Sequence, residues 1–410
     1  EGKGWTPIGT STLASFSGNF DGNYKTIAGL YINRASIYQG LFGAVFYGTV
    51  KNLGVVGVDI SGHGTCGGIT GYIRGTVENC FVTGKIQGLL DDIGDIGGIA
   101  GDVADNAIAK NCYSSAEIRS NNDRVGGITG QVFPGAKVEY CYSTGSVSGT
   151  GQGGVGGIAG YVSGTVQNCA ALNPQVSGSG NVGRVMGSGS GSVALENNFA
   201  FDGMTVMVNN TPKTSLNKGG DKVDGADLSS ATLFGEDFWT TAANWDTAAW
   251  DANVWEFDDG KLPVLKDAAG NVMPGQSGAP GLYLLNLSTD KLSISLAGPS
   301  ISGDGRETPY TCPAHDEELG SVGTMVDISV SGMEGWTNPD VNITVKQKDG
   351  GTAVGTVDDF NGHAHFFYPA NFSGGIIVTA AAKSNPNNEA SVTLTVNKRD
   401  LTGPGDFKIG

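Results

Sequence analysis

The side chains best suited to metal chemistry are few, and two of them stand one residue apart. His363 and His365 flank a single alanine in a strand-like run, so a strand would turn both imidazole rings to one face. Cys312 and His315 could complete a set of four zinc ligands, but nothing in the spacing brings them to the same place. Solvated or hydrogen-bonded histidines are the alternative that needs no metal.

Carboxylates gather in one short stretch. Asp91, Asp92 and Asp95 lie in the longest insertion between the repeats described below, and Asp102 and Asp105 follow closely. Carboxylate oxygens are the ligands that Ca²⁺ prefers, so these residues form a candidate calcium site. An acidic loop that is simply solvated is the alternative. No other cofactor is expected from the sequence.

A unit of about 29 residues recurs six times between about Gly29 and Val206. Taking Gly40, Gly68, Gly98, Gly127, Gly157 and Arg184 as equivalent, the successive separations are 28, 30, 29, 30 and 27 residues. A fixed period in this range indicates a solenoid, a propeller or an array. The unit is too short for a propeller blade of roughly 40 residues, and it is long enough for one turn of a coil.

Within each unit the apolar side chains alternate with a period of two, which predicts strands with one face inside. The alternation breaks just before each cysteine, so we expect bends at Asn79, Tyr140 and Asn168. Each unit then holds about three short strands, and stacked units form a parallel β-solenoid.

The cysteines take the place of aliphatic residues. Four of them share one position of the unit, which Leu53 occupies in the first copy, and Cys66 stands where other copies have isoleucine or valine. We therefore expect buried free thiols along the core, with disulfides or a metal column as the alternatives. The predicted core ladder consists of Cys66, Cys80, Cys112, Cys141 and Cys169.

Aromatic residues follow three of these cysteines and point the opposite way. Phe81, Tyr113 and Tyr142 should form an exposed or semi-exposed ladder on the outside of the solenoid. Tyr72 and Tyr161 fall on a neighbouring face.

Charge and motifs exclude several classes of protein. Acidic residues outnumber basic ones by 40 to 24, and the net charge of −16 disfavours binding to nucleic acid or to anionic membranes. No run of 18 apolar residues is present, so we expect no membrane span. Phosphate loops, dinucleotide fingerprints and Ser/His/Asp arrangements are also absent from the sequence. Residue 1 falls inside a pattern already under way, so we expect upstream residues that could carry a secretion or anchoring segment.

The sequence divides the chain into five parts. The fold class expected is all-β, with a parallel β-solenoid and its cap followed by an immunoglobulin-like sandwich of about seven strands. Four of the six tryptophans fall within 17 residues of the cap, where a sugar site is the alternative to simple end-capping. The expected parts are the solenoid (1–205), the cap (206–267), a linker (268–281), the sandwich (282–400) and a tail (401–410).

The repeats resemble the GLUG-motif repeats of bacterial surface proteins, in which a Gly-Leu/Ile-x-Gly core is followed by an Asn-Cys-Tyr step. The matching stretches are Gly68–Gly71, Gly98–Gly101, Gly127–Gly130 and Gly157–Gly160, with Asn79-Cys80, Asn111-Cys112-Tyr113, Cys141-Tyr142 and Asn168-Cys169. The resemblance covers about residues 1–267. It implies a secreted or surface-anchored bacterial protein, often of the Bacteroidetes type, of the kind described as an adhesin.

The same family includes metallopeptidases of the IgA-protease type, which carry these repeats beside a zinc domain with a His-Glu-x-x-His motif. That motif is absent from this sequence, so the resemblance does not extend to the peptidase. Parallel β-helices also include polysaccharide lyases and hydrolases, which need clustered carboxylates on one outer face. Only Arg119 and Arg124 near Asp123 suggest such a cluster, and a surface ion pair explains them equally well.

We therefore expect a non-enzymatic cell-surface adhesin or binding scaffold, outside the cell or on its outer surface, that contacts an extracellular glycan or a host or matrix protein. The first candidate contact surface consists of Phe81, Tyr113, Tyr142, Tyr72 and Tyr161, because flat aromatic faces at regular spacing suit extended ligands. Packing in the core or between domains is the alternative for these residues. A carbohydrate-active enzyme of the β-helix type and a purely structural stalk are the alternatives for the function.

Overall fold

The computed structural model divides into two compact units, residues 1–281 and 282–410. In the first unit the structure describes residues 2–89, 94–121, 124–151, 153–191, 193–245, 248–258 and 261–276. In the second it describes eight strands and Lys348, which follows one of them. The calcium candidates Asp91 and Asp92 and the zinc candidate His315 lie outside these ranges, and the side chains of Cys312, His363 and His365 are not described.

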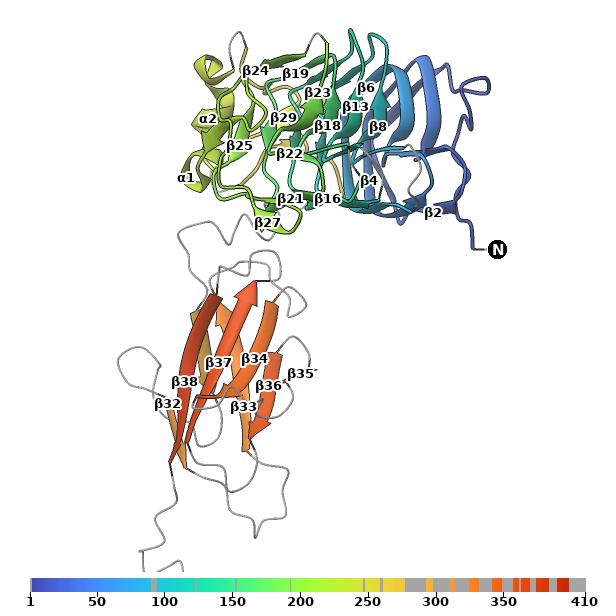
Figure 1. Ribbon diagram of the computed structural model, residues 1–410. Coiled ribbons are helices and arrows are strands. Elements are labelled where there is room, and N and C mark those ends of the chain that lie inside the picture. The colour runs from blue at the N-terminus through green and yellow to red at the C-terminus, as the bar shows by residue number, and fades with distance from the viewer. Residues whose placement is uncertain are drawn as a thin grey trace, which may run out of the picture. The chain divides into compact units, whose positions relative to one another are not determined.

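The first unit is a parallel β-solenoid, as the repeats predict (Figure 1). Each turn of the chain pairs in parallel with the turns before and after it. On one side, a single column of paired residues runs through Thr26, Gly54, Phe81, Tyr113, Tyr142, Ala170, Phe199 and Ala226. The described strands form one large sheet of 22 strands and a smaller one of six, which wind around a common core.

The first turns use long strands that bend at the corners, and the later turns divide into shorter ones. The early strands are β1 (Asn19–Ala28), β2 (Tyr31–Arg34), β3 (Tyr38–Gln39), β4 (Phe42–Gly62), β5 (Thr65–Cys66) and β6 (Thr70–Gly88). The middle strands are β7 (Asp95–Gly97), β8 (Ala100–Val103), β9 (Ile108–Lys110), β10 (Tyr113–Ser114), β11 (Glu117–Ser120), β12 (Arg124–Gly126), β13 (Thr129–Val132), β14 (Lys137–Glu139), β15 (Tyr142–Ser143) and β16 (Val147–Gly149). The late strands are β17 (Gly154–Gly156), β18 (Ala159–Val162), β19 (Thr165–Gln167), β20 (Ala170–Ala171), β21 (Gln175–Gly178), β22 (Asn181–Gly183), β23 (Met186–Gly189), β24 (Ala194–Glu196), β25 (Phe199–Phe201), β26 (Thr205–Val208), β27 (Thr211–Pro212) and β28 (Ala226–Leu228).

Cysteines line one side of the core. Leu53 pairs with Cys80 in the register that the repeats predict, and Cys66 pairs with Ile96. All five described cysteines, Cys66, Cys80, Cys112, Cys141 and Cys169, are buried with free thiols. Burial raises the pKa of the Cys66 thiol to about 12, which keeps it protonated and unreactive at neutral pH.

The corners before the cysteines adopt left-handed backbone conformations. Asn79, Tyr140 and Asn168, where the sequence predicts bends, have φ angles of 54°, 52° and 53°. Asparagine tolerates this region better than most residues, because its short amide can bond locally. The amide groups also bond from turn to turn, since Nδ2 of Asn111 donates to Oδ1 of Asn79 over 3.2 Å. This asparagine column helps to hold the register between turns.

The C-terminal end of the solenoid is covered by the segment that the sequence predicts as a cap. That segment first adds one more strand to the column, because β28 pairs in parallel with β25. Two short helices, α1 (Ser230–Leu233) and α2 (Glu236–Thr240), and a 3₁₀ turn (Ala242–Asn244) then lie at this end (Figure 1). The hairpin of β29 (Trp255–Glu256) and β30 (Val264–Leu265) follows them.

Part of the predicted linker belongs to the first unit. Met273 is buried, and Oγ1 of Thr26 in the first turn donates a hydrogen bond to the carbonyl oxygen of Pro274. The chain from Trp250 to Gln276 therefore runs back along the solenoid toward its first turn. The expectation of a free linker from residue 268 is wrong for residues 268–276, because apolar side chains such as Met273 anchor this stretch.

The second unit is all β. One sheet has the strand order β31-β33-β36-β35 and the other β32-β38-β37-β34. The sequence predicts seven strands here, at 282–287, 292–296, 325–330, 341–347, 364–368, 376–381 and 391–396. Two of the observed strands, β32 and β35, are not among them, and the strand predicted at 282–287 lies outside the described residues. The strands are β31 (Ser293–Ala297), β32 (Tyr310–Pro313), β33 (Thr324–Ser331), β34 (Val341–Gln347), β35 (Val357–Phe360), β36 (His363–Tyr368), β37 (Gly374–Ala382) and β38 (Glu389–Asn397).

In the part of the chain that the structure describes, no helix combines the length and the apolar character needed to cross a membrane.

The asparagine column yields a stability prediction. Asn111→Ala should destabilise the chain by about 1–3 kcal/mol, because alanine is strained at a φ of 52° and loses the bond to Asn79. Asn111→Gly should cost less, since glycine adopts this φ freely and loses only the hydrogen bond. Urea unfolding followed by far-ultraviolet circular dichroism measures both values. An alanine variant as stable as the glycine variant would contradict this account of the corner.

Candidate functional site

Phe81, Tyr113 and Tyr142 form a regular stack, here called the aromatic ladder. Neighbouring ring centroids lie 5.2 and 4.8 Å apart, and the ring planes differ by 8° and 1°. The parallel register of β6, β10 and β15 produces this arrangement, because it places the three residues side by side on successive turns. The predicted ladder is therefore present.

The expectation that this ladder is exposed is wrong. Phe81, Tyr113 and Tyr142 are only 0%, 6% and 3% exposed. Trp255 packs against the rings of both tyrosines at centroid distances of 6.3 and 5.9 Å. Oη of Tyr142 donates a 2.7 Å hydrogen bond to the carbonyl oxygen of Pro263, and burial raises the pKa of both tyrosines. A flat apolar row needs a cover, and the returning tryptophan segment supplies it. These three residues pack in the interior and offer no contact surface.

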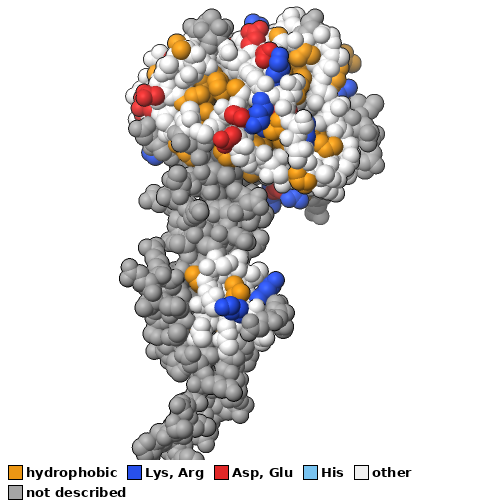
Figure 2. Space-filling view, turned by 60° about the vertical axis from the view of Figure 1, so that its left-hand side comes forward, with side chains coloured by type: hydrophobic (Ala, Val, Ile, Leu, Met, Phe, Trp, Pro, Cys, Tyr) orange, Lys and Arg blue, Asp and Glu red, His pale blue; other side chains and the backbone are white. Residues whose placement is uncertain are grey.

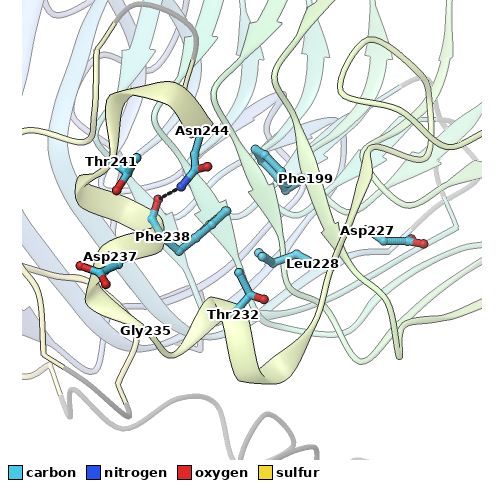
Figure 3. A pocket seen from close by; sticks show the side chains of 9 residues that line it. All are labelled: Phe199, Asp227, Leu228, Thr232, Gly235, Asp237, Phe238, Thr241 and Asn244. Carbon is cyan, nitrogen blue, oxygen red and sulfur yellow. Dashed lines mark hydrogen bonds between the residues drawn. The ribbon is translucent and has the colours of Figure 1, made fainter.

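The seam between the last turn and the cap contains a cavity of about 510 Å³ (Figure 3). Phe199 and Leu228 of the solenoid lie opposite Phe238 of α2, whose carbonyl oxygen accepts a 2.9 Å bond from Nδ2 of Asn244. Asp227 points away from this apolar centre, and it is already paired with Arg184 at 2.8 Å and with Lys218 at 2.7 Å. Packing of the cap explains these groups.

An aromatic patch remains open on another side of the solenoid, near its first turns. Tyr72 is half-buried there, and its ring centroid lies 5.4 Å from that of Tyr38 and 5.6 Å from that of Phe46. Tyr47 is 79% exposed and lies 6.2 Å from Phe46. Its φ of 58° is unusual for an aromatic residue and turns the chain at this point. These four residues, Tyr38, Phe46, Tyr47 and Tyr72, are called the aromatic patch below.

Arg74 supports the patch. Its guanidinium lies 5.4 Å from the ring centre of Phe46 and 5.9 Å from that of Tyr47, and it forms a 3.0 Å ion pair with Asp105. Cation–π contacts of this kind hold aromatic side chains in place at a surface. The patch is therefore oriented by a charged group that is itself neutralised.

A polar row continues from the patch along the solenoid axis. In the parallel register, Tyr72 is followed on successive turns by Asp102, Gln131, Tyr161 and Ser188. Tyr161, the last predicted contact residue, is half-buried and carries the guanidinium of Arg124 at 5.0 Å from its ring centre. The row thus begins at the aromatic patch and reaches a second aromatic ring.

Two carboxyl groups meet in the middle of this row. Asp95 comes from the smaller sheet and Asp102 from the larger one, and the two side chains share a hydrogen bond. Both residues are only 5% exposed. Nη1 of Arg124 lies 3.4 Å from both carboxylate oxygens of Asp95 and 2.6 Å from Oε1 of Gln131, whereas Oδ1 of Asp102 has no partner. This carboxyl pair is enclosed rather than solvated.

Burial raises the pKa of the Asp102 carboxyl well above its usual range, and the nearby charge of Asp95 and their shared hydrogen bond raise it further. Arg124 acts in the opposite direction and does not overcome these effects. The pair therefore keeps a proton to higher pH than an isolated aspartate does. Carboxyl groups in direct contact also leave no room for a sugar or a water between them, unlike the separations of roughly 5–9.5 Å in glycosidases.

The predicted calcium site receives no support from Asp95, which is occupied by Arg124. Among the residues that the structure describes, no group of three or more His, Cys, Asp or Glu side chains could hold a metal ion. Asp91 and Asp92 lie outside those residues. Arg119 pairs with Glu117 on the strand β11 and Arg124 with Asp95 on β7, whereas Asp123, the partner that the sequence suggests for both, is not described.

Sequence reasoning missed most of this face, although one signal was available. Tyr72, Asp102, Gln131 and Tyr161 each directly follow the last glycine of a repeat core, so the alignment already places them in one row. Tyr38, Phe46 and Tyr47 belong to the first copy. Tyr38 and Tyr47 have no aromatic counterparts in later copies, and Phe46 has a single one, Phe133, three turns further on. The repeat pattern therefore does not indicate the patch.

Comparison with known proteins supports the fold. The chain is similar in structure to a protein from Bacteroides ovatus, provisionally assigned as an immunoglobulin A1 protease, with a TM-score of 0.54 and 25% identity over 64% of this chain and 81% of that one. It is 34% identical over 104 residues to halomucin of Haloquadratum walsbyi, a match that spans 25% of this chain and 1% of that protein. No family model matches the chain.

The tryptophan cover yields a stability prediction. Trp255→Ala should cost about 3–5 kcal/mol of the free energy of unfolding, because it opens a cavity over Tyr113 and Tyr142. Trp255→Phe should lower the free energy of unfolding by less, since the phenyl ring still covers part of the ladder. Urea unfolding followed by circular dichroism measures both. A cost below about 1 kcal/mol for the alanine variant would show that the segment does not seal the ladder.

The carboxyl pair yields a prediction about pH. A carboxyl whose pKa is higher in the folded than in the unfolded chain contributes stability below its unfolded pKa of about 4, and this contribution is lost as pH rises through the folded pKa. The asparagine side chain of the Asp102→Asn variant cannot ionise, so the variant does not lose this stability as pH rises. Its melting temperature should therefore exceed that of the wild type by a margin that grows between pH 4 and pH 8. Melting curves at several pH values test this. A difference that does not change with pH would contradict the shared proton.

Proposed function

We propose that this chain is a non-enzymatic, extracellular binding scaffold that holds an extended glycan along the outer face formed by the aromatic patch and the polar row. The observation that carries the proposal is the half-exposed patch of Tyr38, Phe46, Tyr47 and Tyr72, which opens to solvent while the neighbouring aromatic ladder is sealed. Large aromatic surfaces that stay open on a folded protein indicate a partner. A host or matrix protein is the alternative occupant of the same face.

The spacing of the face suits a chain of sugar rings. Turns of the solenoid repeat about every 4.8 Å, so the row from Tyr72 to Tyr161 covers three steps, or about 14 Å. One hexose unit along the axis would then face about one turn. Apolar faces of sugar rings stack on aromatic side chains such as Tyr47 and Tyr72, and the half-buried phenols of Tyr72 and Tyr161 can bond to hydroxyls.

The alternatives fit this face less well. A stalk needs no open aromatic patch, and the carboxyl pair is too close for glycoside hydrolysis by either of the usual geometries. On the side of the molecule drawn in Figure 2, acidic side chains lie beside basic ones at several places rather than in one strong patch of either sign. Attachment of the protein to a cell surface through further residues is part of the same proposal.

The test is a screen of the full chain against immobilised glycans and matrix proteins, followed by affinity measurements on variants. Tyr47→Ala and Tyr72→Ala should each weaken binding by about tenfold, as expected when an aromatic contact residue is truncated. Tyr31→Ala is the matched control, because Tyr31 is an exposed aromatic residue on β2, outside the patch.

Retained folds are checked by circular dichroism. An equal loss of affinity in all three variants, or no binding of any glycan or matrix protein by the wild type, would contradict the proposal. Release of reducing ends or unsaturated products during incubation would favour the enzyme alternative instead.

A further inference from the structure

The carboxyl pair lies between Tyr72 and Tyr161, in the middle of the face that the proposed function assigns to the ligand. We propose that Asp95, Asp102 and Arg124 select the charge of the ligand, so that this face binds uncharged glycans and excludes polyanionic ones. The inference rests on the proposed function and adds to it the chemical class of the glycan.

Both arginines of the face are already engaged. Arg74 is paired with Asp105 at 3.0 Å and lies over Phe46 and Tyr47. Arg124 spans both oxygens of Asp95, bonds to Gln131 and lies over the ring of Tyr161. An acidic sugar would have to draw one of these guanidinium groups away from a carboxylate, and for Arg124 that carboxylate is buried.

One guanidinium faces the two carboxyl groups of the pair. The ionisable groups that face it are Asp95 on β7, Asp102 on β8 and Arg124 on β12, with the phenols of Tyr38 and Tyr72 on β3 and β6. Two carboxyl groups in contact resist ionising together, so the pair keeps a proton to higher pH than an isolated aspartate does. The positive charge of Arg124 is already balanced by this pair, so it is not left over for an anionic ligand.

An uncharged glycan meets no penalty on such a face. Its hydroxyl groups can both donate and accept, and they can bond to the half-buried phenols of Tyr72 and Tyr161 without displacing Arg124. A sulfate or uronate group brings a further negative charge close to Asp95, and both Arg74 and Arg124 are already paired with carboxylates. Juxtaposed like charges exclude a ligand strongly, and electrostatic complementarity therefore sets specificity here.

The test compares polymers that share a backbone and differ in charge. Dextran with dextran sulfate, and hydroxyethyl-cellulose with carboxymethyl-cellulose, are the probes, and binding is measured at pH 7 by affinity electrophoresis or biolayer interferometry. The wild type should prefer the uncharged member by about tenfold or more. Asp95→Asn together with Asp102→Asn keeps the shapes of both side chains and leaves Arg124 without a carboxylate partner. This double variant should gain about tenfold or more for the charged member.

Two controls separate the site from general charge effects. Glu117→Gln removes the partner of Arg119 on another strand and should leave the preference unchanged. Adding Arg124→Gln to the double variant should abolish its gain, because the freed cation is then gone.

Equal affinity of the wild type for charged and uncharged polymers, or an unchanged preference in the folded double variant, would overturn the charge selection while leaving glycan binding itself intact. Failure of every uncharged polymer and of the wider glycan screen would overturn the proposed function and this inference together.

Discussion

Every feature of the first unit depends on one constraint, the stacking of each residue on its equivalent one turn away. Parallel hydrogen bonding fixes the turns about 4.8 Å apart, and the side-chain alternation then fixes which residues face inward. Left-handed corners such as Asn79 and Asn111 keep this register, and glycines allow close approach inside each turn. A Cβ at Gly130, for example, would lie 2.5 Å from the backbone nitrogen of Ile96. Residues that recur at one position of the repeat therefore lie side by side in a row along the solenoid axis.

This constraint produces two aromatic rows, one of which is covered by other residues while the other is not. The row of Phe81, Tyr113 and Tyr142 is continuous and apolar, so it can be covered by tryptophans of the returning segment. The row that starts at Tyr72 is interrupted by Asp102 and Gln131, which an apolar cover would leave with few partners. The first row therefore contributes to stability. In the second row the aromatic rings of Tyr72 and Tyr161 stay half-buried at the surface, whereas Asp102 and Gln131 between them are enclosed and bond to neighbouring side chains.

The sequence predicts the solenoid well because the residues that define each turn recur in several copies. The period, the inward cysteines and the bends at Asn79, Tyr140 and Asn168 each appear in several copies, so each copy supports the others. The exposure of the aromatic ladder was predicted wrongly because it depends on the path of residues 250–276, which carry no repeat. The carboxyl pair escaped prediction for a related reason, since Asp95 and Asp102 belong to different sheets and meet only when the chain closes a turn. The open patch uses Tyr38 and Tyr47, which have no aromatic counterparts in other copies, and Phe46, whose one aromatic counterpart is Phe133.

The central claim is that the face of Tyr47 and Tyr72 is open for a ligand, whereas the ladder of Tyr113 and Tyr142 is sealed. Tyrosine nitration by tetranitromethane, followed by peptide mass spectrometry with and without a glycan selected in the binding screen, tests this most directly. The account predicts that Tyr47 is nitrated in the free protein and protected by the glycan, while Tyr113 and Tyr142 stay unmodified in both samples. Nitration of Tyr113 or Tyr142 in the folded protein, or no protection of Tyr47 by a bound glycan, would contradict it.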